Sequence, residues 1–460
     1  MKPWMLSELK EPLHCTIPCE AQISCVSTDT RNLPEGCLFV ALRGARFDGH
    51  DFVEQAIQAG AAAAVTDHPV GDCPCLVVED TGRALLQIAA FYRKKFHPVL
   101  VGITGSVGKT TTKEMVACAL ESQFSTLKTQ GNLNNEIGLP KTLLQLEDCH
   151  TAAVIEMGMS HFGEISRLSR TAQPTIGVIT NIGYSHIENL KTQEGILQAK
   201  LEIQDGMAPD APLVVNGDDA FLAPLKRDLS RPVVTYGMTS DRTDVRAVDV
   251  VRKAGATAFT IVDQDGTSYP VVLPCAGDHN VMNALAAFCV GRLAGIAPEQ
   301  ICRALEQYQT VGLRQNIYTR GAYTIIADCY NASPDSMKAA LTVLHDLPCQ
   351  GRHVAVLGDM LELGEMSRQL HTLVGDMAAE KEVDGLFCFG KEAFYIAQRA
   401  AMQEVPVYHT EDRRELCRVI RQYLRPGDAV LFKASRGMHL EDCIDVIFEQ
   451  EEAPEDAILD

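Results

Sequence analysis

The stretch "VGITGSVGKTTTKEM", residues 101–115, places glycines, a lysine and threonines in the order that phosphate-binding loops use. A β-branched apolar run precedes the glycines and predicts a buried strand, and the residues after Lys109 predict a helix. A loop between such elements directs backbone N–H groups and the positive end of the helix to one point. Lys109 can neutralise phosphate charge, and Thr110 offers a hydroxyl group to Mg²⁺. We therefore predict a nucleotide site formed by Gly105, Ser106, Val107, Gly108, Lys109, Thr110 and Thr111.

One position departs from the strict phosphate-loop pattern, which has a glycine six residues before the lysine. Ile103 occupies that position, and the loop begins instead with the closer Gly105. The alternative interpretation is a glycine-rich turn that carries a surface lysine. The strand pattern before the loop and the helix pattern after it favour the nucleotide site.

Two more strand ends carry side chains that suit a metal ion. Glu156 ends the apolar run of "AAVIEMG", where a carboxylate needs a partner because its desolvation is costly. The alternative for Glu156 is an ion pair at the strand end. His186 lies in the loop beyond a second strand, in "VITNIGYSHIEN". Because the carboxyl ends of parallel strands converge, both side chains are candidate ligands. Lys200 lies on a predicted helix at this edge, where its pattern alone predicts only a surface lysine.

Polar residues in the second half of the chain are candidates for nucleotide contacts. Asn280 and Asn283 lie one turn apart near the start of a predicted helix, and amides are also common at helix starts. Arg314 follows in an apparent linker. Asp328 ends the strand "TIIADCY", and an acid at a strand end of an open α/β sheet often contacts a ribose or a charged ligand.

Composition excludes several classes of protein. The 460 residues carry a net charge of -19, which disfavours nucleic-acid binding because that depends on neutralising phosphates. The N-terminal residues show no apolar signal region, and no uninterrupted apolar stretch approaches the ~18 residues of a membrane span. The 16 cysteines form no CxxC pair, which favours reduced thiols. We expect a cytoplasmic protein without a membrane span.

The order of predicted elements indicates three α/β domains. Residues 1–97 read as a small mixed α/β domain, and residues 98–311 as a parallel sheet of the P-loop type that ends in a β-rich interval at about 232–274. Residues 312–460 restart the alternation with "TIIADCY", "HVAVLGDM", "GLFCFG" and "DAVLFKAS" and predict a Rossmann-like open sheet.

These segments together resemble the Mur ligase family, the ATP-dependent amide-forming enzymes of peptidoglycan precursor synthesis. Within the family the chain is most similar to the type that adds D-alanyl-D-alanine to UDP-N-acetylmuramoyl-tripeptide. The resemblance covers nearly the whole chain, and members carry the short Gly-x-x-Gly-Lys-Thr loop, which accounts for Ile103. Its motifs are "STDTR", "LFVALRGARFDGHDF", "TGSVGKTTTKEM", "TQGNLNNEIGLP", "EMGMSHFGEI", "TNIGYSHIE", "GDHNVMNALAA", "GLRQNIY" and "YNASPDSMKAAL".

The resemblance implies a role for each part of the chain. The central domain would bind ATP and two Mg²⁺ ions, with Thr110 and Glu156 at the first ion and His186 and Lys200, as a carbamate, at the second. Asn280, Asn283, Arg314 and Asp328 would contact the nucleotide, the last two after the third domain closes. The first domain would hold the uridine nucleotide through Ser27, Thr28, Asp29, Arg31 and His50. Loop residues Asn134, Asn135, Ser160 and His161 would face the tripeptide, and the dipeptide would lie near Asn331 and "GDMLELGE".

The reaction implied is the activation of a peptide carboxylate by phosphoryl transfer and its capture by an amine. The tripeptide carboxylate would attack the γ-phosphoryl group, giving ADP and an acyl phosphate, and the amine of D-Ala-D-Ala would then displace phosphate. Lys109, Glu156, His186 and Lys200 would be the catalytic residues, and closure of the domains would exclude water. We expect a monomer that serves cell-wall biogenesis, and with it cell shape and division.

Alternatives remain at this stage. A ligase that adds diaminopimelate or lysine tends to carry "DYAHTPD"-like and, for the former, "DNPR" motifs, whereas this chain has "DCYNASPD". Folylpolyglutamate synthetase normally lacks the N-terminal block, and a nucleotide-gated regulator need not retain Glu156, His186 and Lys200. The sequence leaves open whether the third residue of the tripeptide is diaminopimelate or lysine. Ser333 stands where the family usually has Asn, which puts the second substrate in question, and "CAGDHN" replaces a more common apolar lead-in.

Overall fold

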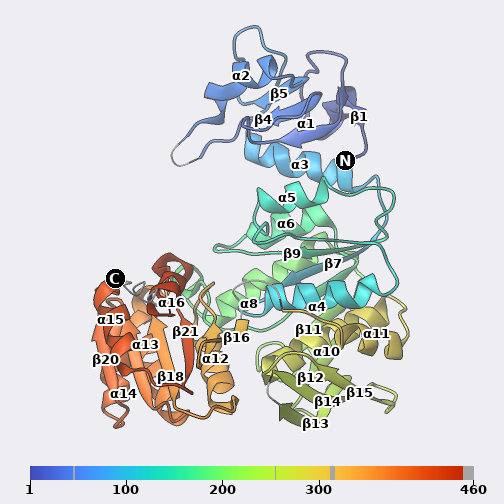
Figure 1. The fold of residues 1–460 in the computed structure, drawn as a ribbon. Helices are drawn as coiled ribbons and strands as arrows, with labels where there is room; N and C mark the ends of the chain where they lie inside the picture. The colour runs from blue at the N-terminus through green and yellow to red at the C-terminus, as the bar shows by residue number, and fades with distance from the viewer. Residues whose placement is uncertain (45–46, 254, 311–315, 449–460) are drawn as a thin grey trace, which may run out of the picture.

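The computed structural model describes residues 1–44, 47–253, 255–310 and 316–448, which form three α/β bodies in chain order (Figure 1). The first holds a parallel four-stranded sheet, the second a nine-stranded sheet and the third a six-stranded sheet. The predicted fold class is confirmed. Each large sheet falls within one predicted domain, and the boundaries at 97/98 and 311/312 stay a prediction. No helix in the described ranges is long and apolar enough to cross a bilayer.

The N-terminal body packs firmly on the central one through its last helix. Arg93 at the end of this helix donates from Nε to the carbonyl of Ala172 at 2.7 Å and from Nη2 to that of Gln173 at 3.2 Å. These carbonyls end α6, so the guanidinium satisfies two acceptors that the helix leaves free. Figure 1 shows α3 lying against α5 and α6. The elements of this body are β1 (Trp4–Met5), α1 (Lys10–Leu13), β2 (Gln22–Ile23), β3 (Cys25–Ser27), β4 (Cys37–Val40), α2 (Val53–Gln58), β5 (Ala63–Thr66), β6 (Cys75–Val77) and α3 (Thr81–Arg93).

The central sheet has the strand order β15-β14-β13-β12-β11-β10-β7-β9-β8 and is parallel from β8 to β13. Its strands are β7 (Val99–Thr104), β8 (Thr126–Lys128), β9 (Ala152–Glu156), β10 (Ile176–Ile179), β11 (Leu213–Asn216), β12 (Val233–Gly237), β13 (Val245–Lys253), β14 (Ala256–Val262) and β15 (Ser268–Leu273). Its helices are α4 (Lys109–Glu121), α5 (Gly138–Leu143), α6 (Glu164–Ala172), α7 (Ile187–Leu190), α8 (Gln193–Leu201), α9 (Leu225–Asp228), α10 (Asp278–Leu293) and α11 (Pro298–Leu305).

Buried side chains on the two faces of this sheet form separate cores. Val101 and Ile103 belong to the core shared with α4 and α10, and Leu100 and Ile155 belong to the core on the opposite face. This alternation follows from the two-residue period of a strand. The register pairs Ile103 with Glu156 and Thr104 with Ile179, so β7, β9 and β10 end at the same edge. The loops after these three strands are therefore brought together.

The third body is an open sheet of order β16-β17-β21-β18-β19-β20, parallel except for β16. Its strands are β16 (Asn316–Arg320), β17 (Tyr323–Ala327), β18 (His353–Gly358), β19 (Gly385–Phe389), β20 (Val407–Thr410) and β21 (Ala429–Lys433), and its helices are α12 (Pro334–Asp346), α13 (Ser367–Glu380), α14 (Ala393–Ala401), α15 (Arg413–Tyr423) and α16 (Glu441–Phe448). The four predicted strands are present. The edge strands β16 and β20 were not predicted, because they are only partly buried and lack a continuous apolar run.

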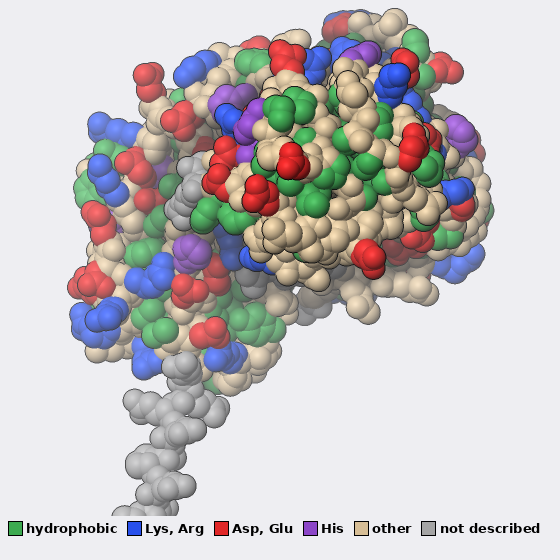
Figure 2. Space-filling model, turned by 90° about the horizontal axis from the view of Figure 1, so that it is seen from above, with side chains coloured by type: hydrophobic (Ala, Val, Ile, Leu, Met, Phe, Trp, Pro, Cys, Tyr) green, Lys and Arg blue, Asp and Glu red, His purple; other side chains and the backbone are tan. Residues whose placement is uncertain are grey.

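Charge is spread over the surface. Figure 2 shows acidic and basic side chains interspersed on the face formed by the N-terminal body and the flank of the third body.

Candidate active site

A cavity of about 920 Å³ lies between the central and third bodies, at the carboxyl ends of β7, β9 and β10. It gathers most of the residues predicted to act on the nucleotide and the peptide. Those that line it are Ser106, Val107, Gly108, Lys109, Thr110, Thr111, Asn134, Asn135, Glu156, Ser160, His186, Asn280, Asn283, Asp328 and Asn331. Gly105 lies one residue from this lining, and Lys200 is not part of it.

The predicted phosphate loop connects β7 to α4. Gly108 is the N-cap of α4, so the first N–H groups of the helix point into the cavity. Nζ of Lys109 donates to the carbonyl of Gly105 at 2.9 Å and so lies over the loop. A Cβ atom at Gly105 would lie 1.8 Å from Oγ1 of Thr180, so only glycine fits where the loop passes the end of β10. This arrangement suits an anionic ligand.

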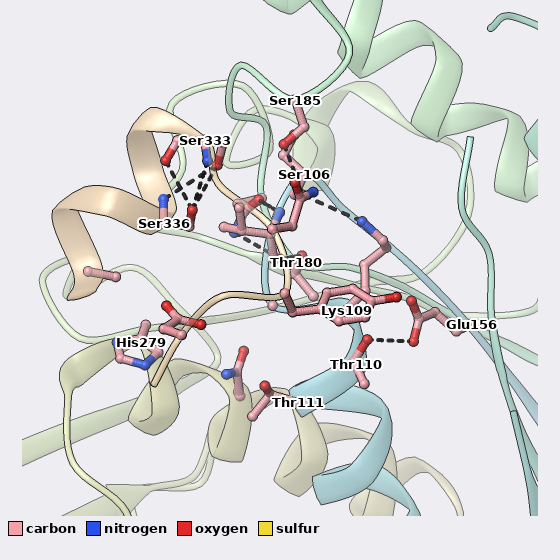
Figure 3. A pocket seen from close by; sticks show the side chains of 18 of the residues that line it. Ser106, Lys109, Thr110, Thr111, Glu156, Thr180, Ser185, His279, Ser333 and Ser336 are labelled. Atoms are coloured by element: carbon pink, nitrogen blue, oxygen red, sulfur yellow. Dashed lines mark hydrogen bonds between the residues drawn. The ribbon is translucent and has the colours of Figure 1, made fainter. Parts of the chain in front are cut away.

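Thr110 and Glu156 face each other at the cavity wall (Figure 3). The hydroxyl of Thr110 donates to Oε2 of Glu156 at 2.9 Å, and Nδ2 of Asn134 donates to Oε1 at 2.8 Å. The ammonium group of buried Lys113 stays 4.0 Å from Glu156 and is closer to the carbonyl of Thr129, at 2.6 Å. The ion pair between Lys113 and Glu156 is therefore a long one. Its two oxygens and the threonine hydroxyl form a hard-oxygen donor set that fits Mg²⁺.

The loop after β10 is tied to the phosphate loop by hydrogen bonds that sequence patterns did not reveal. Oδ1 of Asn181 accepts from the N–H of Val107 at 2.9 Å, and Oγ1 of Thr180 donates to the carbonyl of Val107 at 2.6 Å. The N–H of Gly183 donates to Oγ of Ser106 at 2.8 Å, and the hydroxyl of Ser185 donates to its carbonyl at 3.2 Å. Figure 3 shows Ser106, Thr180 and Ser185 grouped around this junction.

Lys200 lies in α8 and is only 1% exposed, so its interpretation as a surface lysine was wrong. Its side chain is buried because α8 turns this face toward the body, which the short helix pattern did not show. Burial lowers the pKa of the Lys200 amine well below its usual value, and the charge of Lys109 adds to this effect. A buried amine close to the phosphate loop, with its neutral form favoured by burial, follows from this geometry.

His186 lies at the boundary between the two bodies. Its Nδ1 atom lies 2.6 Å from Oε2 of Glu362, in the loop after β18 of the third body. The hydrogen-bonded His186 ring lowers the pKa of Glu362. Both residues adopt positive φ angles, 64° and 62°, so two strained loops meet here. The family resemblance indicated the loop that contains Glu362 but not this contact.

The amides of α10 contact each other and the phosphate-loop helix. Oδ1 of Asn283 accepts from the hydroxyl of Thr112 at 2.9 Å, and its Nδ2 donates to Oδ1 of Asn280 at 3.4 Å. Nδ2 of Asn280 donates to the carbonyl of Ala276 at 2.7 Å. Both amides line the cavity with their positions fixed. Arg314, the next predicted nucleotide contact, lies outside the described residues.

Asp328 is held by a lysine that the sequence did not single out. Nζ of Lys433, at the end of β21, lies 2.7 Å from Oδ2 of Asp328 and donates to the carbonyl of Asn331 at 2.9 Å. The lysine side chain is almost fully buried. A charged residue directly after the apolar run "AVLF" was the available signal, the same signal that identified Glu156. Ser333, the departure from the family pattern, is the N-cap of α12 and accepts from the N–H of Ser336 at 3.5 Å.

Comparisons with known protein families match a segment in each of the three bodies. Family models match in order: "Mur ligase family, catalytic domain" at residues 22–92, "Mur ligase middle domain" at 103–291 and "Mur ligase, glutamate ligase domain" at 313–436. A UDP-N-acetylmuramoyl-tripeptide–D-alanyl-D-alanine ligase from Bacillus subtilis (strain 168) is 42% identical over 92% of this chain and 93% of its own. The chain belongs to the Mur ligase family.

Solved structures of Mur ligases share its fold. MurF from Acinetobacter baumannii superposes with a TM-score of 0.91 at 33% identity, over 98% of this chain and 100% of that one. MurF ligase from Thermotoga maritima in complex with ADP gives a TM-score of 0.83 at 30% identity, over 92% of this chain and 96% of that one. The three-domain architecture expected from the resemblance is therefore confirmed.

The predicted residues of the N-terminal body lie apart from the lining of this Mur ligase cavity. Asp29 and Arg31 form an ion pair, and the Arg31 guanidinium lowers the pKa of Asp29. Ser27 donates to the carbonyl of Asp29 at 2.9 Å, and Thr28 lies between them. His161, predicted to face the tripeptide, does not line the cavity and is exposed. The cavity therefore brings together the nucleotide and metal candidates except Lys200 and Arg314, but not those for the uridine end.

His50 belongs to a cluster with Asp67 and His68 whose atoms are close enough to hold a metal ion. Its Nδ1 atom lies 2.6 Å from Oδ1 of Asp48, and its Nε2 accepts from the N–H of Asp67 at 3.1 Å. Both ring nitrogens are therefore occupied, so this histidine does not fit a metal ligand. It fixes the loop before α2 against the end of β5.

Proposed function

We propose that this Mur ligase joins D-alanyl-D-alanine to UDP-N-acetylmuramoyl-tripeptide at the expense of ATP, giving the pentapeptide precursor, ADP and phosphate. The observation that carries the proposal is the cavity, which joins the phosphate loop and the Thr110–Glu156 pair to loops of the third body. The named relatives, similar over nearly the full chain, support the choice of substrates. ATP is supported by the ADP complex of the Thermotoga maritima relative.

The chemistry follows from the arrangement. An amine does not add to the carbon of an unactivated carboxylate. One carboxylate oxygen therefore first attacks the γ-phosphorus of ATP, and the bond between this phosphorus and ADP breaks. The amine then adds to the carbonyl carbon, loses a proton, and phosphate leaves with the bonding pair of the acyl–oxygen bond. Lys109 and the N-terminus of α4 would stabilise the charge on the transferring group. Asn134, Asn135 and Ser160, which line the same cavity, would orient the tripeptide end.

Two ions of Mg²⁺ are part of the proposal. Thr110 and Glu156 would hold the first, because both present oxygen atoms within 2.9 Å of each other at the cavity wall. His186 and Lys200 would serve the second, and Lys200 would do so as a carbamate. A neutral amine adds to CO₂ and releases a proton, which converts it into an oxygen donor, and burial lowers the pKa of Lys200 and so favours the neutral form. When bound, the ions would neutralise the charge of the phosphoryl group.

A smaller hollow of about 120 Å³ beside the main cavity is the proposed site of the dipeptide. It lies between the central loop at His186 and three loops of the third body, with Asn331, Glu362 and Arg436 among its lining. A zwitterionic dipeptide presents one ammonium and one carboxylate group, and Glu362 and Arg436 supply the matching charges. The guanidinium of Arg436 also contacts Oε1 of Glu441, which holds it on the short helical turn after β21.

The remaining assignments are proposals of the same kind. The N-terminal body would bind the uridine nucleotide through Ser27, Thr28, Asp29 and Arg31, with His50 keeping the neighbouring loop in place. The functional domains would be residues 1–97, 98–311 and 312–460. We propose that the enzyme acts as a monomer in the cytoplasm.

The deciding experiment supplies purified protein with Mg·ATP, UDP-N-acetylmuramoyl-tripeptide and D-Ala-D-Ala, together and with each omitted in turn. ADP and the pentapeptide product should form in equal amounts only in the complete mixture. Replacing D-Ala-D-Ala by a single amino acid should abolish product. ADP release that is the same without either peptide partner would contradict the ligase assignment, and product from a diaminopimelate or lysine donor would contradict the choice of dipeptide.

A further inference from the structure

The third body contacts the central body at a second carboxylate, Asp335, which the proposed mechanism does not use. Asp335 lies in the first turn of α12, and its Oδ2 atom accepts from the N–H of Tyr184 at 3.3 Å. A Cβ atom at Gly183 would lie 2.0 Å from Oδ2 and 2.9 Å from Cγ of Asp335. The carboxylate therefore occupies the space that any side chain at Gly183 would need.

Gly183 also contacts the phosphate loop. Its N–H donates to Oγ of Ser106 at 2.8 Å, and a Cβ atom at Gly183 would lie 3.3 Å from Cβ of Ser106. The peptide between Gly183 and Tyr184 is thus held between Ser106 of the central body and Asp335 of the third. Ser106 lines the nucleotide cavity and is itself buried.

We propose that Asp335 is a positioning residue that transmits the docking of the third domain to the phosphate loop through Gly183 and Ser106. The proposal rests on the proposed function, because it assigns this contact to the domain closure of that reaction. When the third domain closes on the second substrate, its carboxylate fixes residues 183–184, and these fix Ser106. When the domain opens, the loop loses this support.

The charges around Asp335 suit a contact that forms and breaks. Burial raises the pKa of Asp335, and the nearby Asp219 adds to this, whereas the Tyr184 N–H and Lys338 lower it. Asp219 accepts from the N–H of Ile182 at 2.8 Å and so holds the same loop from the central side. A desolvated carboxylate whose hydrogen bond across the domains is long gains less free energy than one in an ideal charge-assisted bond. Such a contact can hold a loop in place without locking two domains together.

The test compares Asp335→Ala, Asp335→Asn and Gly183→Ala with a control on the same helix. Asp346, in the last turn of α12, lies 3.6 Å from Nε of Arg252 and contacts the central body away from residues 183–184. Asp346→Ala therefore removes a charged contact between the same two bodies without touching the phosphate loop.

We expect Asp335→Ala to raise the KM for ATP and for D-Ala-D-Ala about tenfold, a size within the range that coupled networks show. The KM for the tripeptide substrate should stay unchanged. Asp335→Asn should have KM values for ATP and D-Ala-D-Ala close to those of the wild type, because Oδ1 of the asparagine can accept from the N–H of Tyr184. Gly183→Ala should raise the same KM values as Asp335→Ala. In the double variant the effects on KM should be much less than additive, because both changes disrupt the same contact between residues 183–184 and Asp335. Asp346→Ala should leave all three KM values at the wild-type level.

Melting temperature and the affinity for Mg·ADP, measured by calorimetry without the other substrates, provide readouts independent of turnover. Unchanged KM values in Asp335→Ala, or equal shifts in Asp346→Ala, would overturn the proposal. Additive effects of Asp335→Ala and Gly183→Ala would do so as well. A wild-type protein that releases ADP without the peptide substrates would instead contradict the proposed function. If Gly183→Ala does not fold, Asp335→Ala and Asp335→Asn decide the question.

Discussion

Thr110 and Glu156 are joined by a hydrogen bond of 2.9 Å from the threonine hydroxyl to Oε2, which links the first turn of α4 to the end of β9. The two residues are 46 positions apart in the chain and meet because β7 and β9 are neighbouring parallel strands. Glu156 is almost fully buried, and the ammonium group of Lys113 lies 4.0 Å from its Oε2 atom. The proposed Mg²⁺ site rests on this pair of oxygen donors beside the phosphate loop.

Loss of the Glu156 carboxylate should abolish turnover while the fold is retained. We expect Glu156→Gln to lower kcat by at least about 100-fold, because a neutral amide cannot replace a charged ligand of Mg²⁺. Its melting temperature should stay close to the wild-type value, since the Gln oxygen can still accept from Thr110 and a rotated Asn134 amide can accept from the Gln NH₂ group. Glu147→Ala, at an exposed ion pair with the N-terminus, is the control. A rate within a few fold of wild type in Glu156→Gln would contradict the metal assignment.

Carbon dioxide should be needed for full activity. Because burial lowers the pKa of Lys200, its neutral amine can form a carbamate, and enzyme kept free of CO₂ should lose activity that bicarbonate restores. With ¹³C-labelled bicarbonate, a carbamate resonance should appear in wild-type protein and be missing in Lys200→Met. Activity and spectrum that are indifferent to bicarbonate would show that Lys200 acts as a plain amine.

Removal of Lys433 should weaken nucleotide binding through Asp328. Breaking a buried pair by removing one partner costs about 3–5 kcal/mol, so we expect Lys433→Met to lower both stability and ATP affinity. The double variant Lys433→Met with Asp328→Asn should recover much of the stability, because no unpaired charge is left, but not the ATP affinity. Thermal denaturation and Mg·ADP calorimetry separate the two effects. Full recovery of ADP affinity in the double variant would show that Asp328 is only structural.

Arg436 should set the affinity for the dipeptide. We expect Arg436→Ala to raise the KM for D-Ala-D-Ala by about 10- to 100-fold, the loss of one charge-assisted hydrogen bond of about 1.5–3 kcal/mol, with little change for ATP. Arg418→Ala, an exposed arginine on α15, is the matched control. Initial-rate measurements with each substrate varied in turn make the comparison. A rise in the KM for ATP of the same size would place Arg436 at the nucleotide instead.

Acid should destabilise the loop that carries Glu362. His371 is fully buried, its Nε2 accepts from the N–H of Met360 at 3.0 Å, and burial lowers its pKa below 6.5. The unfolded chain therefore takes up a proton that the folded chain resists. The contribution of His371 to the free energy of unfolding is fully present above about pH 6.5. It falls as the pH drops below this value, by at most about 1.4 kcal/mol per pH unit.

The control variant is His371→Gln, because its amide oxygen can accept from the N–H of Met360 and does not titrate. Melting temperatures measured between pH 8 and pH 5 should fall more steeply for wild type than for the variant. Parallel curves would show that the histidine does not control the acid response.

Local spacing was enough to predict the phosphate loop, because the strand, the glycines, Lys109 and the following helix are neighbours in the chain and together determine the backbone path. The same held for Glu156 and Asp328, each a charged residue at the end of a buried strand. The motif resemblance added the ligand role of Lys200 and the dipeptide loops, and predicted the family that the comparisons confirmed. Roles that need a bound ligand or ion stay predictions.

Tertiary structure decided what spacing leaves open. Lys200 follows an ordinary helical pattern, and only the packing of α8 buries its amine. Lys433 meets Asp328, Glu362 meets His186, and Asp335 meets Gly183 because sheets and domains place distant segments side by side. A sequence pattern records the period and the ends of each element, whereas these contacts depend on how separate elements are oriented. That orientation is determined by the shapes of the buried cores and by the register of the strands.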